Sequence, residues 1–308
     1  MKDLFQFLIF PGIIFTAVAG CLASWIDRKV TARIQWRVGP PIFQPFFDIV
    51  KLLGKEISIP KGGARWTFLF SPLIAFASVS LVSTLLWRII FSPSTTYVGD
   101  LIVVIYLLTI PSLCIIISGA ASANPLSSLG ASREMKMILS YELPFILVLF
   151  VPVIQTGGAI TLGQILLWQK AQHIIFFSPS GVLAFIVAII CMQAKLGLVP
   201  FDIPEAEAEI IAGPYTEYSG APLALYKLTR WMTLFVLPIF LTVMFLGGIT
   251  FSGMSILWGV LKYVVLLVII ILIRNTNPRL RIDQAMRLFW GPVLALALLA
   301  VILSFLGV

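Results

Sequence analysis

Eight long apolar runs restrict the fold of this 308-residue chain more than any other feature of its sequence. They lie at about residues 4–25, 68–91, 101–121, 136–156, 181–200, 222–247, 255–273 and 288–307. Each run is about twenty residues long, which is the length that an α-helix needs to cross the roughly 30 Å hydrocarbon core of a bilayer. The runs are continuous and do not alternate between apolar and polar residues, which excludes a transmembrane β-barrel.

The composition indicates the same fold class. Only 11% of the residues are charged, whereas soluble domains carry about 25%. The first run is longer than the apolar region of a signal peptide, so we interpret it as a membrane span. We therefore predict an all-α, polytopic membrane protein whose eight transmembrane helices form a single domain over residues 1–308.

The basic residues predict how these spans are oriented. Eight spans alternate sides, and the segments on one side hold seventeen of the 21 Lys and Arg residues; these segments are 26–67, 122–136, 195–230 and 274–287. The positive-inside rule therefore predicts cytoplasmic loops at about 26–67, 122–136, 201–221 and 274–287. We expect both termini to lie outside, in a multi-pass protein of the cell membrane.

The cysteine and histidine content argues against a redox centre within this chain. The three cysteines, Cys21, Cys114 and Cys191, are isolated in or beside apolar runs, and an iron–sulfur cluster needs four thiolates. With His173 as the only histidine, a bis-His haem is impossible and a His-based metal site is not expected. The sequence also lacks a Walker loop, a GxGxxG fingerprint, a nucleophile elbow and an HExxH motif. We expect no cofactor, metal or catalytic residue in this chain, and no nucleic-acid partner.

An acidic segment, VPFDIPEAEAEIIAGPYTEYSG, lies between two apolar runs at residues 199–220. Five of the 13 acidic residues fall within it: Asp202, Glu205, Glu207, Glu209 and Glu217. Pro204 suits the first turn of a helix, whose N-terminus would stabilise Asp202 and Glu205. Glu205 and Glu209 would repel each other on such a helix, and coupled carboxylates of this kind can relay protons. The segment is therefore either a proton relay or a solvated helix start that contacts another subunit.

Glu142 lies one to two turns inside an apolar run, in ILSYELPFILVLF. A charge at that depth costs about 2.5–3.5 kcal/mol on insertion scales, so this side chain must face protein or a water-filled cavity. We interpret Glu142 as part of a proton or ion path. The alternative is a structural ion pair with a basic residue at similar depth, namely Lys195, Lys227 or Arg230.

Two polar segments on the predicted cytoplasmic side favour contacts with a membrane surface or with partner proteins. In QPFFDIVKLLGKE (residues 44–56), the spacing of apolar and charged residues is typical of an amphipathic helix at a membrane surface. In RNTNPRLRIDQAMR (residues 274–287), four arginines stand against a single acid, Asp283. This balance of charge suits an acidic partner or anionic lipid.

Five motifs, in this order, carry a family resemblance: DRKVTARIQWRVGPP, QPFFDIVKLLGKE, GASREMKMILSYE, PFDIPEAEAEIIAGPYTEYSG and RLRIDQAMRLFW. They resemble the membrane subunit of respiratory complex I that closes the quinone pocket, which is the bacterial H subunit or mitochondrial subunit 1. They are equally similar to its homologues in energy-converting, membrane-bound nickel–iron hydrogenases and in related sulfur-reducing complexes. The resemblance extends from residue 24 to residue 290.

This resemblance implies eight transmembrane helices, a surface helix after the first, and a peripheral arm of iron–sulfur proteins docked on the cytoplasmic side. The implied proton or ion path comprises Glu142, Asp202, Glu205, Glu207, Glu209 and Glu217. The implied junction with the arm comprises Arg28, Lys29, Arg33, Arg37, Gln44, Asp48, Lys51, Arg279, Arg281 and Asp283. The expected partners are hydrogenase-like large and small subunits, a ferredoxin-like iron–sulfur subunit, antiporter-like membrane subunits and lipid. Iron–sulfur clusters and a nickel–iron centre would belong to the partner subunits.

The sequence departs from the complex I pattern at three places, and two of them, the shortened loop and the GP insertion, favour the hydrogenase branch. The chain has DRK from Asp27 where complex I usually has ERK, GPYTEYSG at 213–220 where it tends to have GYxxEYS, and a shortened GPPIFQP at 39–45. The shortened loop borders the quinone entrance in the family, which puts a quinone site in question. We expect a non-catalytic membrane anchor that couples ferredoxin-driven hydrogen evolution or sulfur reduction to H⁺ or Na⁺ pumping. The alternatives are the quinone-binding subunit of an NADH or ferredoxin:quinone oxidoreductase, and a free-standing secondary transporter.

Overall fold

A computed structural model describes residues 2–94, 99–251 and 253–307, without the side chains of residues 2–4, 207 and 208. Within this part of the chain every regular element is a helix and no strand is present. Seven spans are long and apolar enough to cross a membrane. They are α1 and α2 (Lys2–Leu8 and Ile13–Ile34), α4 (Arg65–Phe91), α5 (Asp100–Ala121), α6 (Pro125–Gln155), α10 (Gly220–Phe245), α11 (Ser255–Thr276), and α12, η3 and α13 (Ile282–Leu288, Phe289–Val293 and Leu294–Phe305). A further apolar helix, α8 (Pro179–Lys195), has 17 residues. The predicted fold class, an all-α polytopic membrane protein, is confirmed.

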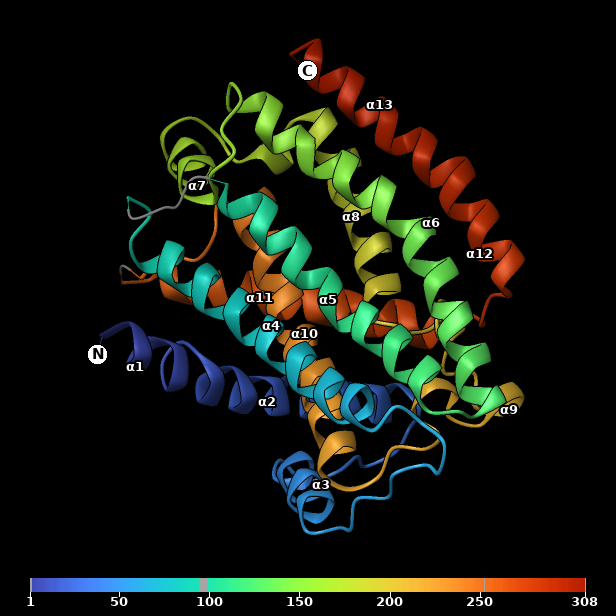
Figure 1. Ribbon diagram of the computed structural model, residues 1–308. Helices are drawn as coiled ribbons and strands as arrows, with labels where there is room; N and C mark the ends of the chain where they lie inside the picture. Colours follow the sequence, from blue (N-terminus) through green and yellow to red (C-terminus); the bar gives the residue numbers. More distant parts are fainter. Residues whose placement is uncertain (1, 95–98, 252, 308) are drawn as a thin grey trace.

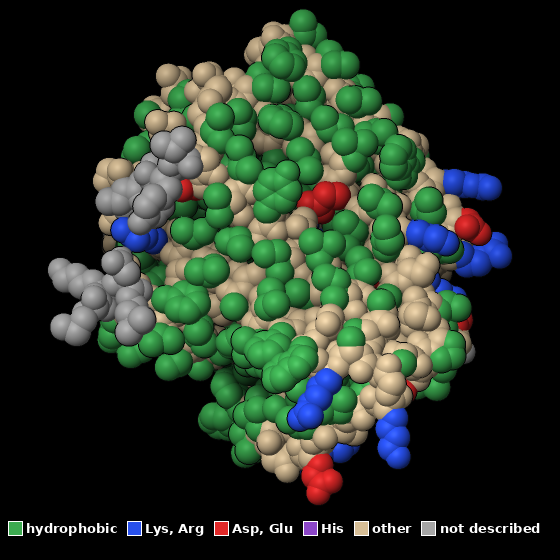
Figure 2. Space-filling model, viewed as in Figure 1, with side chains coloured by type: hydrophobic (Ala, Val, Ile, Leu, Met, Phe, Trp, Pro, Cys, Tyr) green, Lys and Arg blue, Asp and Glu red, His purple; other side chains and the backbone are tan. Residues whose placement is uncertain are grey.

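Helix α10 lies at the centre of the bundle (Figure 1). It packs against α2 and α4, and α11 also packs on α2. Helix α5 contacts both α4 and α6, while α6 packs with α8 and α13. All residues of α10 from Trp231 to Phe245 are buried. The outer spans instead present apolar side chains on the molecular surface, as a bilayer environment requires. In Figure 2 most charged side chains lie at the margin of the face, and one acidic side chain lies near its middle.

The close approach of α2 to α10 depends on Gly20. A Cβ atom at this position would lie 2.8 Å from the backbone nitrogen of Met232 and 2.9 Å from the backbone carbonyl carbon of Trp231. Small residues at such crossings let membrane helices come close enough for van der Waals packing to hold them together. Since α2 carries Arg28 and α10 carries Arg230, this contact also positions charged side chains of the candidate site.

Helix α6 is longer than the sequence predicts, because it begins at Pro125 and not near residue 136. The side chain of Asn124 caps it by accepting a hydrogen bond of 2.9 Å from the Leu126 N–H. Pro125 then occupies the first turn, where a missing N–H has no cost. The segment predicted as a loop at 122–136 is therefore helical from Pro125 onward, while its cytoplasmic location stays a prediction. Its polar residues lie on about three additional helical turns, which pack against the segment between α8 and α10.

The predicted surface helix is confirmed as α3 (Gln44–Leu53). Its side chains Phe47, Val50 and Leu53 are exposed, while the helix packs on α2 and α10. An apolar, exposed face of this kind suits a helix that lies at the membrane surface.

The acidic segment has only a short helix, which begins at Glu207 and not at Pro204, so the expected helix start is wrong. Residues 196–219, here named the acidic connector, join α8 to α10 and contain only the short elements α9 (Glu207–Ile210) and η2 (Gly213–Tyr215). The physical reason is the absence of backbone N–H donors at three prolines, which helix interiors do not tolerate: Pro200, Pro204 and Pro214. The connector is therefore an irregular segment, and its side chains are fixed by contacts with neighbouring helices.

Candidate functional site

Among the side chains that the structure describes, three ion pairs tie the acidic connector to its neighbours. They are Asp202–Arg279 (2.7 Å), Glu205–Arg230, and Glu209–Arg133 (2.5 Å). The basic partners come from the segment before α12, from α10 and from α6. The helix-start explanation for Asp202 and Glu205 is therefore wrong, and so is the expected contact between Glu205 and Glu209 on successive turns of one helix.

The remaining acids of the connector differ in how they are placed. The Asn124 side-chain amide donates a hydrogen bond of 2.5 Å to the Glu217 carboxylate, which links the connector to the first turn of α6. The side chain of Glu207 lies outside the described residues. Burial raises the pKa of the neighbouring Tyr215 well above its usual value, and the negative charge of Glu205 raises it further. Tyr215 is therefore a neutral hydrogen-bonding group at physiological pH.

Glu142 forms an ion pair with Lys195, with 3.0 Å between Oε2 and Nζ. The Lys195 side chain is 2% exposed and that of Glu142 18%. The ammonium also lies 5.4 Å from the ring centroid of Tyr141 and 5.1 Å from that of Phe145, an arrangement that stabilises a desolvated cation. Of the three basic partners considered for Glu142, the structure selects Lys195.

A small cavity of about 50 Å³ lies between the Glu205–Arg230 and Glu142–Lys195 pairs. Its polar lining includes Glu134, Lys195, Glu205, Tyr215 and Arg230. Roughly 10–15 Å³ suffices for one water molecule that has polar partners, so this cavity has room for a few. The polar groups that line the small cavity therefore lead from the acidic connector to the interior of the bundle.

Glu134 is the site residue that the sequence interpretation missed. It stands in the motif GASREMKMILSYE, in a stretch that the composition assigns to a loop. Because α6 begins at Pro125, Glu134 lies on the same helix as Glu142, eight residues earlier, and lines the small cavity. Eight residues correspond to a rotation of about 80° around a helix axis. This spacing is the signal that could have identified Glu134, had the helix start been known.

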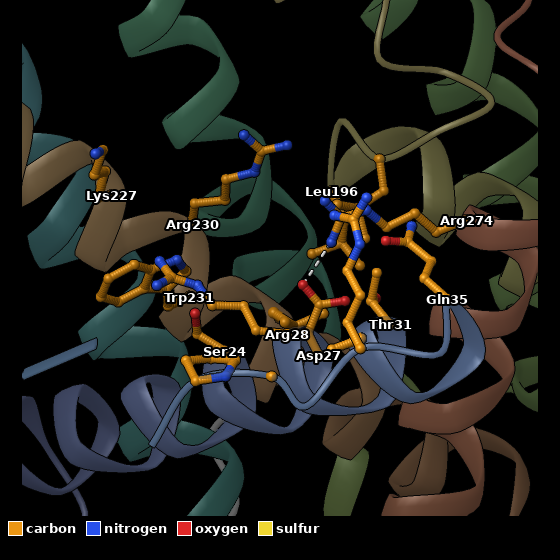
Figure 3. Close-up of a pocket in the computed structure, with 16 residues that line it drawn as sticks. Ser24, Asp27, Arg28, Thr31, Gln35, Leu196, Lys227, Arg230, Trp231 and Arg274 are labelled. Carbon is orange, nitrogen blue, oxygen red and sulfur yellow. Dashed lines mark hydrogen bonds and ion pairs between the residues drawn. The ribbon is translucent and has the colours of Figure 1, made fainter. Parts of the chain in front are cut away.

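A large cavity of about 560 Å³ lies between α2, α10 and the start of the connector (Figure 3). Its charged lining consists of Asp27, Arg28, Arg37, Lys227, Arg230 and Arg274. Arg274 pairs with Asp27 at 2.5 Å, and the Arg28 guanidinium lies 5.3 Å from the centroid of the Trp231 ring. Arg230 and Leu196 line both the large and the small cavity, so these two residues lie between the two spaces.

Some of the predicted junction residues form an ordered cluster at α3. Arg28 pairs with Asp48 at 2.7 Å, and the Gln44 amide donates a hydrogen bond of 3.0 Å to the same carboxylate. Partial burial acts to raise the pKa of Asp48, but these hydrogen bonds and the charge of Arg28 outweigh it and hold the pKa below its usual value. The Lys29 ammonium donates a hydrogen bond of 2.8 Å to the Val38 carbonyl. This cluster fixes α3 to the end of α2.

The other predicted junction residues lie on the surface. Exposed side chains are found at Arg33, Arg37, Lys51, Arg281 and Asp283, whereas Arg279 is held by its pair with Asp202. The exposed residues are accessible to a partner protein or to lipid headgroups, so their role at a junction stays a prediction.

The chemistry offered by the described side chains is acid–base and electrostatic. Carboxylates, an ammonium, guanidinium groups and phenols surround spaces that have room for water. Cys21, Cys114 and Cys191 are buried free thiols. In the described ranges, no three His, Cys, Asp or Glu side chains are placed to hold a metal ion.

Comparison with known proteins places these features in a family. The sequence matches the NADH dehydrogenase family over residues 5–305. The NADH-quinone oxidoreductase subunits H of Bacillus cereus (strain B4264) and Bacillus thuringiensis (strain Al Hakam) are each 33% identical over 319 residues, covering 97% of this chain and 94% of theirs. A chain of the membrane-bound sulfane sulfur reductase (MBS), an archaeal respiratory membrane complex, superimposes with a TM-score of 0.88 at 30% identity and covers 99% of this chain and 100% of its own. These likenesses confirm the resemblance predicted from the five motifs.

Proposed function

Because this chain belongs to the NADH dehydrogenase family of respiratory membrane subunits, we propose that it is the coupling subunit of an ion-translocating redox complex. It anchors an iron–sulfur arm on the cytoplasmic side and links electron transfer in that arm to H⁺ or Na⁺ transport. The electron donor is a ferredoxin, and the final acceptor is sulfur or protons. The likeness to a subunit of a sulfane sulfur reductase complex, at a TM-score of 0.88, supports this branch of the family.

One observation carries the proposal, namely the series of charged groups that leads from the surface into the bundle. It begins at the Glu205–Arg230 pair of the connector, passes the small cavity and ends at the Lys195–Glu142 pair. Ionisable residues at membrane depth are typical of ion and proton paths. A free-standing transporter would need no surface like the basic one at Arg33, Arg37 and Lys51.

The mechanism follows from electrostatics. A docked arm that changes its redox state would displace the connector and with it the Glu205–Arg230 pair. Because Arg230 lines the small cavity, its displacement changes the potential at Lys195 and so the proton affinity of Glu142. Two sites that change each other's ion affinity in this way are coupled in both directions, as pumping requires.

A second candidate function is quinone binding, and the large cavity is the observation that favours it. Its volume of about 560 Å³ lies within the roughly 300–1,000 Å³ of small-molecule sites. Gly39 and Pro40 of the shortened loop line it, so the loop that departs from the complex I pattern also shapes this cavity. Quinone extracted from the purified complex in amounts equal to the protein would favour this function, and a quinone-free active complex would exclude it.

The variant Glu142→Gln tests the proposed function. The amide keeps the shape of the side chain and its carbonyl still accepts a hydrogen bond from Lys195, but it cannot release a proton. We expect the complex to assemble, to lose ion uptake into inverted vesicles, and to transfer electrons slowly or without coupling. Glu56→Gln is the matched control, because Glu56 is an exposed acid outside both cavities. Normal ion uptake by an assembled Glu142→Gln complex would reduce Glu142 to a structural ion-pair partner.

A further inference from the structure

Lys195 is a buried cation that pairs with one carboxyl group on α6 and lines the same cavity as a second. Its ammonium pairs with Glu142 at 3.0 Å, and its side chain also lines the small cavity that Glu134 borders. Glu134 and Glu142 are eight residues apart, which places them about 12 Å apart along the helix axis. Among the residues that the structure describes, Glu134 forms no ion pair. Lys195 therefore pairs with one acid of α6 and lines the same cavity as the other.

The charge balance around the small cavity sets the protonation of the second acid. The titratable groups that face it are Glu134 from α6, Lys195 from α8, Glu205 and Tyr215 from the connector, and Tyr226 and Arg230 from α10. Arg230 is paired with Glu205 and Lys195 with Glu142, so neither cation of the cavity lining is paired with Glu134. A carboxyl group without a cation in such a confined space favours its neutral form, so Glu134 holds a proton while Lys195 pairs with Glu142.

We propose that Lys195 alternates between Glu142 and Glu134 across the small cavity, and that Glu134 is a proton-holding residue of the ion path. When the ammonium moves to Glu134, that carboxyl group releases its proton, and Glu142, now unpaired, takes one up. The total charge of the three groups stays the same, and the result is the transfer of one proton from Glu134 to Glu142. The role of this step in pumping rests on the proposed function, whereas the exchange of partners can be tested without pumping.

The surroundings of Lys195 suit a side chain with two positions. A lysine ammonium is a compact charge on a flexible four-carbon stem. The rings of Tyr141 and Phe145 lie 5.4 Å and 5.1 Å from it and attract the cation without fixing it to either carboxylate. Tyr141 lies between the two acids in the sequence, seven residues after Glu134, so its ring borders the route.

The first experiment measures assembly in a set of related variants. Glu134→Gln and Glu142→Gln each leave one carboxylate for Lys195, so both complexes should assemble at close to wild-type levels. The double variant leaves a buried ammonium without a carboxylate. Its level of assembled complex should therefore fall by a factor much larger than the product of the factors found for the two single variants. Adding Lys195→Met to the double variant should restore assembly, because an apolar side chain of similar volume replaces the unpaired cation. A double variant that assembles as the single ones predict, or a triple variant that is not rescued, would overturn the exchange.

The second experiment measures ion uptake in inverted vesicles of the whole complex. Glu134→Gln should abolish uptake, Glu134→Asp should retain part of it with a shifted pH profile, and Glu56→Gln should behave as wild type. Uptake lost in Glu142→Gln but intact in Glu134→Gln would refute the role of Glu134 and leave the proposed function standing. Uptake intact in both variants would refute the proposed function itself.

Discussion

Replacement of Gly20 by alanine is expected to weaken the contact between α2 and α10. The added methyl carbon would lie 2.8 Å from the backbone nitrogen of Met232 and 2.9 Å from the backbone carbonyl carbon of Trp231. Favourable contacts between non-bonded atoms lie at about 3.5–4.0 Å, so the two helices must separate locally by roughly 0.7 Å. Overpacking of this kind costs about 1–3 kcal/mol. We expect the upper half of that range, because the atoms met are backbone atoms and no side chain can move aside.

The measurement is the free energy of unfolding of the purified subunit in mixed micelles of mild and denaturing detergent. Gly20→Ala should lower it by about 2–3 kcal/mol. The matched control is Gly291→Ala, where an added methyl would meet no atom within 4 Å. Its effect should stay within about 0.5 kcal/mol, as for a surface substitution.

The same variant should also affect the large cavity, because α2 and α10 form two of its walls. Widening the gap at Gly20 displaces Arg28 relative to Arg230. Chemical labelling of residues that line the large cavity should therefore change, while labelling of residues that line the small cavity should not. Equal stability of Gly20→Ala and Gly291→Ala would refute the reasoning, since it would mean that α2 and α10 do not approach closely at Gly20 in the membrane.

Three further predictions concern the surface of the protein. Asp48→Lys places a second cation beside Arg28 and should release the peripheral arm while the membrane subunits stay assembled; an intact complex on native gels would limit α3 to lipid anchoring. Because the pKa of Asp48 is held below its ordinary value of about 4, its pair with Arg28 is complete above that pH and weakens as the pH falls through the lowered value. Sedimentation should therefore find the arm attached at about pH 5 and released only in stronger acid, and release already at neutral pH would contradict the assignment. In the variant His173→Cys the new thiol should react with a membrane-impermeant reagent added outside, and in Arg281→Cys it should not. The buried native thiols give a low background. The opposite labelling would invert the predicted orientation.

The membrane class and the surface helix could be predicted from the sequence because they depend on local physics. A continuous apolar run can satisfy its backbone in lipid only as a helix, and the spacing around Asp48 allows only one face of α3 to be apolar. Glu142 could be identified as a special residue because a charge in lipid is costly. Its partner could not be chosen among Lys195, Lys227 and Arg230, since that choice depends on how α8 packs against α6.

The start of α6 and the course of the connector could not be predicted, because distant contacts decide them. The polar stretch around Glu134 resembles a loop in composition, yet the cap at Asn124 and packing against the connector make it helical. Three acids of the connector are placed by basic side chains on α6, on α10 and in the segment before α12. Both cavities are formed by segments far apart in the chain, so no local pattern marks them.

The three ion pairs of the acidic connector differ from the interior pair in how ionic strength acts on them. Glu209 is 53% exposed and Arg279 34%, and exposed pairs of this kind contribute only about 0–1 kcal/mol each. Raising the salt concentration from about 0.1 M to about 1 M shortens the screening length from roughly 10 Å to roughly 3 Å. The Lys195–Glu142 pair, whose lysine is 2% exposed, is screened far less. Concentrated salt should therefore loosen the connector from α6, α10 and the segment before α12 while the Lys195–Glu142 pair stays intact. If the proposed function is right, electron transfer should then continue while ion uptake stops.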